Sequence, residues 1–74
     1  MGKRNQHVVR HERGWAVRGA ASRKASSVHQ TQKEAINAAR DIARRQKTEL
    51  FIHDRSGKIR ARDSYGNDPF PPEG

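Results

Sequence analysis

The chain contains no cysteine, few aromatic residues and no long apolar run. Without cysteine it can form neither a disulfide nor a thiolate metal site, and a reducing, cytoplasmic setting fits this composition. A membrane-spanning helix needs about 20 consecutive apolar residues, and the sequence has no run of that kind. No apolar stretch of signal-peptide length follows the charged N-terminus. We therefore expect no membrane partner.

Acidic residues are also scarce relative to basic ones. Sixteen Lys and Arg stand against eight Asp and Glu, so the formal net charge is +8. A positive potential of this size attracts polyanions. The composition therefore favours nucleic acid or another acidic surface as a partner, although charge alone does not identify the partner.

The length of 74 residues predicts one small domain with a thin core. A chain this short buries only about 60% of the surface that its unfolded form exposes. We expect a flexible basic N-terminus over residues 1–6, a single α+β domain over residues 7–63 and an extended tail over residues 64–74. The tail is predicted because it holds all three prolines and two glycines.

Two short β-prone runs, His7–His11 and Trp15–Gly19, are joined by a connection that contains glycine. This pattern predicts a β-hairpin, in which the period-two rule places Trp15 and Val17 on one face. Trp15 is the expected anchor of the core. Residues Lys24–His29 are predicted to add a short third strand.

The segment Gln32–Gln46 is predicted to be helical. Thr31 and Glu34 have the spacing of a capping box, in which each side chain satisfies a backbone donor of the first turn. The apolar residues that fall on one helix face are Ala35, Ile36, Ala39, Ile42 and Ala43. Because most of them are alanine, we expect the helix to pack closely on strands that supply larger side chains.

Glu49–His53 and Lys58–Asp63 predict a second hairpin around a turn that starts at Asp54 and ends at Gly57. Alternation places two sets of side chains on opposite faces. The set expected to face the helix is Leu50, Ile52, Ile59 and Ala61. The set expected to face away is Lys58, Arg60 and Arg62. The predicted fold is thus a small antiparallel sheet of four to five strands with a single helix on one face.

Segments spread along the chain also carry a family pattern. They are His7–Val9, Gly14–Arg18, Thr31–Ile36, Ala39–Arg40, Glu49–His53, Gly57–Arg60 and Tyr65–Pro69. Together they resemble the bacterial family called domain of unknown function 2188, over nearly the whole chain. The placing of a helix on an antiparallel sheet is also similar to YegP-like domains. The resemblance implies a fold but no function, because the family has no established activity.

Two groups of basic residues are the candidate nucleic-acid-binding residues. The first, the helix stripe, is Lys33, Arg40, Arg44 and Lys47. The second, on the sheet, is Lys58, Arg60 and Arg62, which Arg10 and Arg18 are expected to join. Such rows can neutralise consecutive phosphates and release counterions, and an exposed Phe51 or Tyr65 would add base stacking. The alternatives are an ordinary solvated helix face and a charged row that protects a sheet edge.

No catalytic or metal-binding grouping stands out. On a strand, His7 and His11 would lie about 13 Å apart, too far to share a metal ion. The carboxylates are mostly accounted for by caps, turns and the tail, and the serines have no partners that imply a nucleophile. We therefore expect no enzyme, no cofactor and no metal site.

Two functions remain open. The leading hypothesis is a small non-enzymatic module that binds DNA or RNA through phosphate contacts. The alternative is a module that binds another protein or forms a homodimer, in which the charge serves solubility. The proline-rich tail with Tyr65 and Phe70 fits a docking segment equally well as a cover for the core or a loose end.

Overall fold

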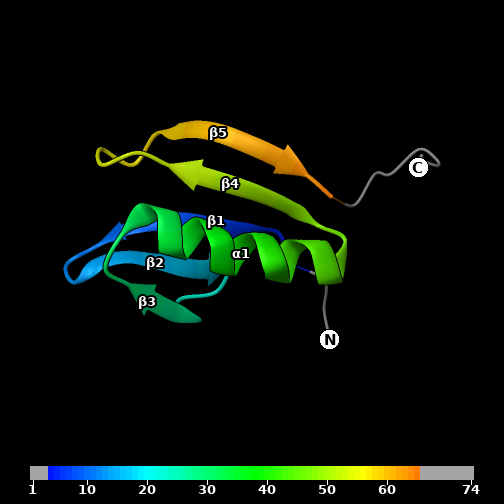
Figure 1. The fold of residues 1–74 in the computed structure, drawn as a ribbon, viewed down its shortest axis with the longest axis horizontal. Helices are drawn as coiled ribbons and strands as arrows, with labels where there is room; N and C mark the ends of the chain where they lie inside the picture. Colours follow the sequence, from blue (N-terminus) through cyan, green and yellow to red (C-terminus); the bar gives the residue numbers. More distant parts are fainter. Residues whose placement is uncertain (1–3, 66–74) are drawn as a thin grey trace.

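A computed structural model describes residues 4–65, which form a β-sheet with a helix across one of its faces (Figure 1). The elements in chain order are β1 (Gln6–His11), β2 (Gly14–Gly19), β3 (Ser27–His29), α1 (Gln32–Gln46), β4 (Glu49–His53) and β5 (Ile59–Ser64). The strands lie in the sheet in the order β3-β2-β1-β4-β5. The α+β class, both hairpins and the helix are confirmed, and the third strand is shorter than predicted.

The domain limits lie slightly outside the expected ones. Residue Gln6 already belongs to β1 and Ser64 still belongs to β5. Asn5 also contacts the domain, because its side-chain oxygen accepts a hydrogen bond from the backbone N–H of Glu49 at 3.0 Å. Tyr65 packs against the core. The rest of the predicted tail, residues 66–74, lies outside the described residues.

Helix α1 begins and ends where the local sequence predicts. The Thr31 hydroxyl accepts a hydrogen bond from the backbone N–H of Glu34 at 3.1 Å, which satisfies one free donor of the first turn. The helix ends at Gln46, and the left-handed backbone of the following residue, Lys47 (φ 58°), prevents it from continuing. Within residues 4–65, no helix has the length and apolar character needed to cross a membrane.

The centre of the sheet differs from the prediction, because β1 and β4 pair in parallel, with Val8 opposite Ile52. Strands β1, β2 and β3 alternate in direction, so β3 runs the same way as β1. Helix α1 then carries the chain back, and a strand that follows such a crossover runs parallel to the strand before it. The sheet is therefore mixed, and the expectation of a wholly antiparallel sheet is wrong.

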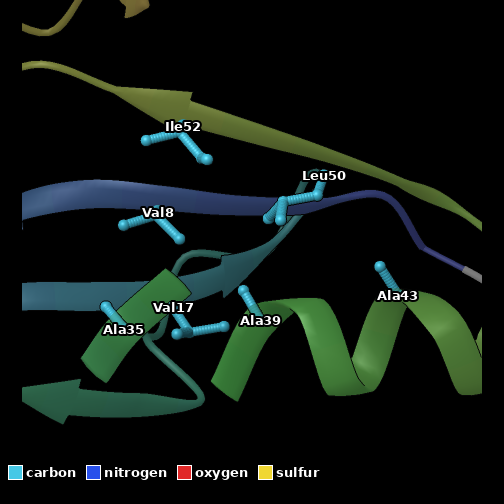
Figure 2. Packing of buried hydrophobic residues seen from close by; sticks show 7 residues of the cluster. All are labelled: Val8, Val17, Ala35, Ala39, Ala43, Leu50 and Ile52. Atoms are coloured by element: carbon cyan, nitrogen blue, oxygen red, sulfur yellow. The ribbon is translucent and has the colours of Figure 1, made fainter. Parts of the chain in front are cut away.

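The core lies between α1 and the central strands (Figure 2). Its largest fully buried side chains are Val8, Val17 and Leu50. They meet the helix face formed by Ala35, Ala39 and Ala43, each of which is fully buried. The predicted division between small helix residues and larger strand residues is therefore confirmed.

Trp15 lies at the margin of this core. It shares the helix-facing side with Val17 as predicted, but it is only partly buried and packs against the buried cluster from outside. The guanidinium carbon of Arg10 lies 5.8 Å from the centre of its ring, in the range of a cation–π contact. The aliphatic strand residues therefore anchor the core, and Trp15 contributes less to it than the sequence predicts.

Strand β5 departs from simple alternation. A bulge pairs Ile52 with Ala61 but His53 with Ile59, so one residue of β5 has no partner in β4. Helix α1 packs on β1 to β4 and leaves β5 uncovered, and Ile59 is 55% exposed. Leu50 and Ile52 face the helix as expected, and Ala61, which pairs with Ile52, lies on the same side but is exposed. Ile59 pairs with His53 and so lies on the opposite side, and the expectation that it faces the helix is wrong.

Replacing a core residue should be far more damaging than replacing an exposed residue of similar size. Leu50→Ala should lower the free energy of unfolding by about 3 kcal/mol, because it leaves a cavity against the helix alanines. Ile59→Ala, at an exposed position, should lower it by about 1 kcal/mol or less. Urea unfolding followed by circular dichroism measures both, and equal losses would contradict the assigned core.

Two glycines with positive φ offer a second matched pair. A β-carbon on Gly14 (φ 136°) would overlap the backbone carbonyl oxygen of His29 in β3, whereas a β-carbon on Gly57 (φ 94°) would meet nothing within 4 Å. Gly57→Ala should therefore lower the free energy of unfolding by about 1 kcal/mol, through backbone strain alone. Gly14→Ala should cost more than about 2 kcal/mol, because β3 must also move. Thermal unfolding of both variants tests this order.

Candidate functional site

Within residues 4–65, no element covers the sheet face opposite α1, here called the outer face (Figure 1). Because successive strand residues point to opposite sides, the neighbours of the buried strand residues point to this face. They include His7 and Val9 in β1, Arg18 in β2, Val28 in β3, Glu49, Phe51 and His53 in β4, and Ile59 and Arg62 in β5. Ala16 of β2 points the same way but is itself buried, at 2% exposure. The outer face thus combines aromatic, aliphatic and basic side chains.

Four of these residues form a row across the sheet, here called the cross-strand row. The strand register pairs Arg18 with His7, His7 with Phe51 and Phe51 with Arg62. The rings of His7 and Phe51 stack, with their centres 5.1 Å apart and their planes 21° from parallel. The row is therefore a two-ring stack with an arginine on each side.

His53 extends the aromatic group through a hydrogen bond. His7 Nδ1 lies 3.0 Å from His53 Nε2, and His53 Nδ1 lies 3.1 Å from the backbone oxygen of Gly57. A carbonyl oxygen can only accept, so His53 Nδ1 carries a proton and donates to Gly57. When both rings are neutral, His7 Nδ1 then donates to His53 Nε2. This arrangement leaves His7 Nε2 as an acceptor.

The pKa of His7 lies below the usual histidine value of 6.5. Partial burial is the largest cause, because it disfavours the charged ring, and the nearby His53 and Arg18 act in the same direction. His7 is therefore mainly neutral at pH 7. The positive charge of the cross-strand row at pH 7 then comes from its two arginines.

The predicted sheet group does not share one surface. Arg62 and Arg18 point to the outer face as expected. Arg60 instead donates from its Nη1 to Gln32 Oε1 at 2.8 Å, at the start of α1. The bulge in β5 turns Arg60 to the helix side, because one extra residue shifts the alternation. The expectation that Arg60 faces away from the helix is therefore wrong.

Two other members of that group also lie elsewhere. Arg10 sits on the helix side with Trp15, where its Nη1 donates to the backbone oxygen of Gly14 at 2.7 Å. Lys58 precedes β5 in the turn, and its backbone N–H donates to Asp54 Oδ1 at 3.0 Å. The expectation that Arg10 lies on the outer face is wrong. Arg10 is two residues from the buried Val8 in β1, so alternation puts both on the helix side.

The helix stripe lies in the other layer of the molecule. Lys33, Arg44 and Lys47 are exposed and Arg40 is partly buried. These residues belong to α1 or its end, so the sheet separates them from the outer face. No single flat surface can therefore hold both predicted groups, and a role for the stripe in binding stays a prediction.

The histidine pair was missed by sequence reasoning. His7 and His53 are 46 residues apart, and only the parallel pairing of β1 with β4 brings them together. The sequence pairs His7 with His11, which lies four residues away in the same strand. One signal in the sequence was available: Phe51 and His53 alternate with Leu50 and Ile52 in β4, which places Phe51 and His53 on the same face. Of the two aromatic residues proposed for stacking, Phe51 is on the outer face and Tyr65 packs on the core.

A second candidate is a surface hollow of about 470 Å³ beside the end of α1 and the start of β1. Its lining includes Arg4, Gln6 and Arg45. The Arg4 guanidinium donates to the backbone oxygen of Ala20, and Arg45 forms an ion pair with Asp41 at 2.9 Å. Because both arginines are engaged within the chain, the outer face is the better candidate for an anionic ligand.

Metal binding has no support among residues 4–65, where no group of three or more His, Asp or Glu side chains comes together. His7 and His53 form a pair without a third ligand, and their nitrogens are already joined by a hydrogen bond. A structural or catalytic zinc site needs at least three protein ligands. The histidine pair therefore belongs to the aromatic group formed with Phe51.

Comparisons with known proteins agree with the resemblance read from the sequence. A family model described as "Uncharacterized protein conserved in bacteria (DUF2188)" matches residues 6–65. The chain belongs to this family. It is similar to the uncharacterized protein YdaT of Bacillus subtilis (strain 168), with 34% identity over 62 residues, and the match covers 84% of this chain and 41% of that relative. No solved structure matches.

The lowered pKa of His7 predicts how stability depends on pH. Below the usual value of 6.5, His7 of the unfolded chain takes up a proton more readily than His7 of the folded chain. The free energy of unfolding therefore includes a contribution from the neutral His7 ring that is fully present above pH 6.5. This contribution is lost as the pH falls towards the lowered pKa of His7 in the folded chain. Urea unfolding at about pH 7.5 and about pH 5.5 should show a smaller pH-dependent loss in His7→Gln than in the wild type.

The matched control is His11→Gln, at the other end of the same strand. It should keep the wild-type pH-dependent loss, because it removes neither ring of the His7–His53 pair. If His7→Gln loses as much stability on acidification as the wild type does, the environment assigned to His7 is wrong.

Proposed function

We propose that this protein is a small non-enzymatic module that binds nucleic acid through the outer face of its sheet. The single observation behind the proposal is the cross-strand row, in which Arg18 and Arg62 flank the stacked rings of His7 and Phe51. Arginine pairs with phosphate oxygens through a planar fork of N–H donors, and aromatic rings stack on bases. The row offers both kinds of contact on one exposed surface.

The charge of the whole chain supports this proposal. The formal net charge is +8, so a polyanion is attracted from a distance whatever surface it finally contacts. In the proposed mode the helix stripe adds to this attraction from the opposite layer. One acid, Glu49, also lies on the outer face, two residues before Phe51. The proposal requires a cytoplasmic location, where bacterial nucleic acid is found.

The second candidate function is association with a protein, including a second copy of the chain. The observation in its favour is that Val28 and Ile59, on strands at opposite edges of the sheet, are 40% and 55% exposed. Apolar side chains at such positions can add to a buried contact. Against it, the edge strand β5 carries Arg60, Arg62 and Asp63, and charged edges deter strand pairing.

Removing the two arginines of the row should weaken binding to nucleic acid and make it less sensitive to salt. Fluorescence anisotropy with labelled DNA and RNA, at about 50 mM and about 200 mM salt, measures both properties. The double variant Arg18→Gln/Arg62→Gln should lose about tenfold in affinity at the lower salt and show a flatter salt dependence.

The matched control is Arg40→Gln/Arg44→Gln, which removes the same charge from the helix stripe. It should weaken binding about twofold to threefold, through long-range attraction alone. Equal losses in the two double variants would mean that binding follows net charge and not the outer face. No binding by the wild type at the lower salt would overturn the proposal, and a dimer seen by light scattering would then favour the second function.

A further inference from the structure

We infer that the outer face binds single-stranded nucleic acid in preference to a duplex, with unpaired bases stacking on the His7–Phe51 pair. The inference rests on the proposed function and names the form of nucleic acid that the face selects. It is carried by two rows of side chains that lie side by side on the outer face. One is the cross-strand row, and the other is aliphatic.

The stacked rings provide the contact that only an unpaired base can use fully. The stack leaves the far face of Phe51 uncovered by His7, whereas His7 also has the His53 ring beside it, with ring centres 5.2 Å apart and planes 36° from parallel. His7 and Phe51 are both partly exposed. A base that lies on a free ring face lengthens the stack. Bases in a duplex already stack on their neighbours on both sides, so they cannot do this without leaving the helix.

The aliphatic row argues against a duplex on the same face. The strand register places Val28 opposite Ala16 and Ala16 opposite Val9, so an apolar row runs across β3, β2 and β1. Ala16 is itself buried, at 2% exposure, so the apolar surface open to a ligand is Val28, which is 40% exposed, and the partly buried Val9. In β1 and β2 the apolar row lies two residues from the cross-strand row. A duplex laid on the sheet would press phosphates against these side chains, and an unpaired charge placed on apolar surface loses hydration without compensation. Bases and sugars of a single strand can cover the same surface.

The positions of the arginines fix how the strand lies. Arg18 is in β2 and Arg62 is in β5, with β1 and β4 between them, so the two arginine residues flank the ring stack on neighbouring strands. Phosphates paired with both arginines would place the bases between them over His7 and Phe51. The bound segment therefore crosses the strands of the sheet and does not follow them.

The first test uses the wild-type protein alone. Labelled single strands of DNA and of RNA, a duplex of the same length and an abasic strand of the same length are titrated at one low salt concentration. The base-bearing strands should bind about tenfold tighter than the abasic strand, because each stacked base adds to the affinity. They should also bind more tightly than the duplex. Comparing the affinities for the DNA and RNA single strands shows whether the sugar contributes to binding.

The second test changes the stacking ring and keeps the phosphate contacts. Phe51→Leu should bind the base-bearing strands about tenfold more weakly and bind the abasic strand and the duplex as the wild type does. Phe51→Trp, which keeps an aromatic face, should retain the wild-type preference. Circular dichroism confirms that both variants are folded before their affinities are compared.

The outcomes separate this inference from the proposed function. If the wild type binds abasic, duplex and base-bearing strands equally, the inference is overturned while phosphate binding stands. The same holds if Phe51→Leu is folded and keeps the preference for base-bearing strands. If the wild type binds none of the strands, the proposed function fails, and the inference fails with it.

Discussion

The parallel pairing of β1 with β4 is the contact on which the rest of the molecule depends. It joins the two hairpins, which the chain connects through β3 and the helix, into one sheet. On the helix side it sets Val8 beside Ile52 in the core, and on the outer face it sets His7 beside Phe51. The same pairing therefore produces the core and the candidate site.

Helix α1 decides which surfaces remain free. Its alanines bring it close to the central strands, and it packs on β1 to β4, while β5 reaches it through the hydrogen bond from Arg60 to Gln32. A small domain of this kind has a thin core, so partly buried outer-face residues such as His7 and Phe51 also contribute to stability. The proposed binding would therefore use residues that also contribute to stability, and a variant that keeps the ring aromatic is expected to disturb the fold least.

What a basic residue can bind depends on where the fold places it. Several basic residues are engaged within the chain, where Arg10 makes a cation–π contact with Trp15, Arg60 contacts Gln32 and Arg45 pairs with Asp41. Arg18 and Arg62 differ from them because they flank a ring stack on an uncovered face. Net charge alone predicts attraction to polyanions, whereas this arrangement supports a particular mode of contact.

The local elements could be predicted from the sequence because their causes are local. Thr31 caps the helix within one turn, and Asp54 and Gly57 close a turn within four residues. The direction of β4 relative to β1, the bulge that redirects Arg60 and the contact between His7 and His53 depend on pairing between distant segments. Periodicity shows which residues share a face of one strand, but it carries no information about the neighbouring strand. The elements and the excess of charge were therefore determined by the sequence alone, and the composition of the outer face was decided only when the strands paired.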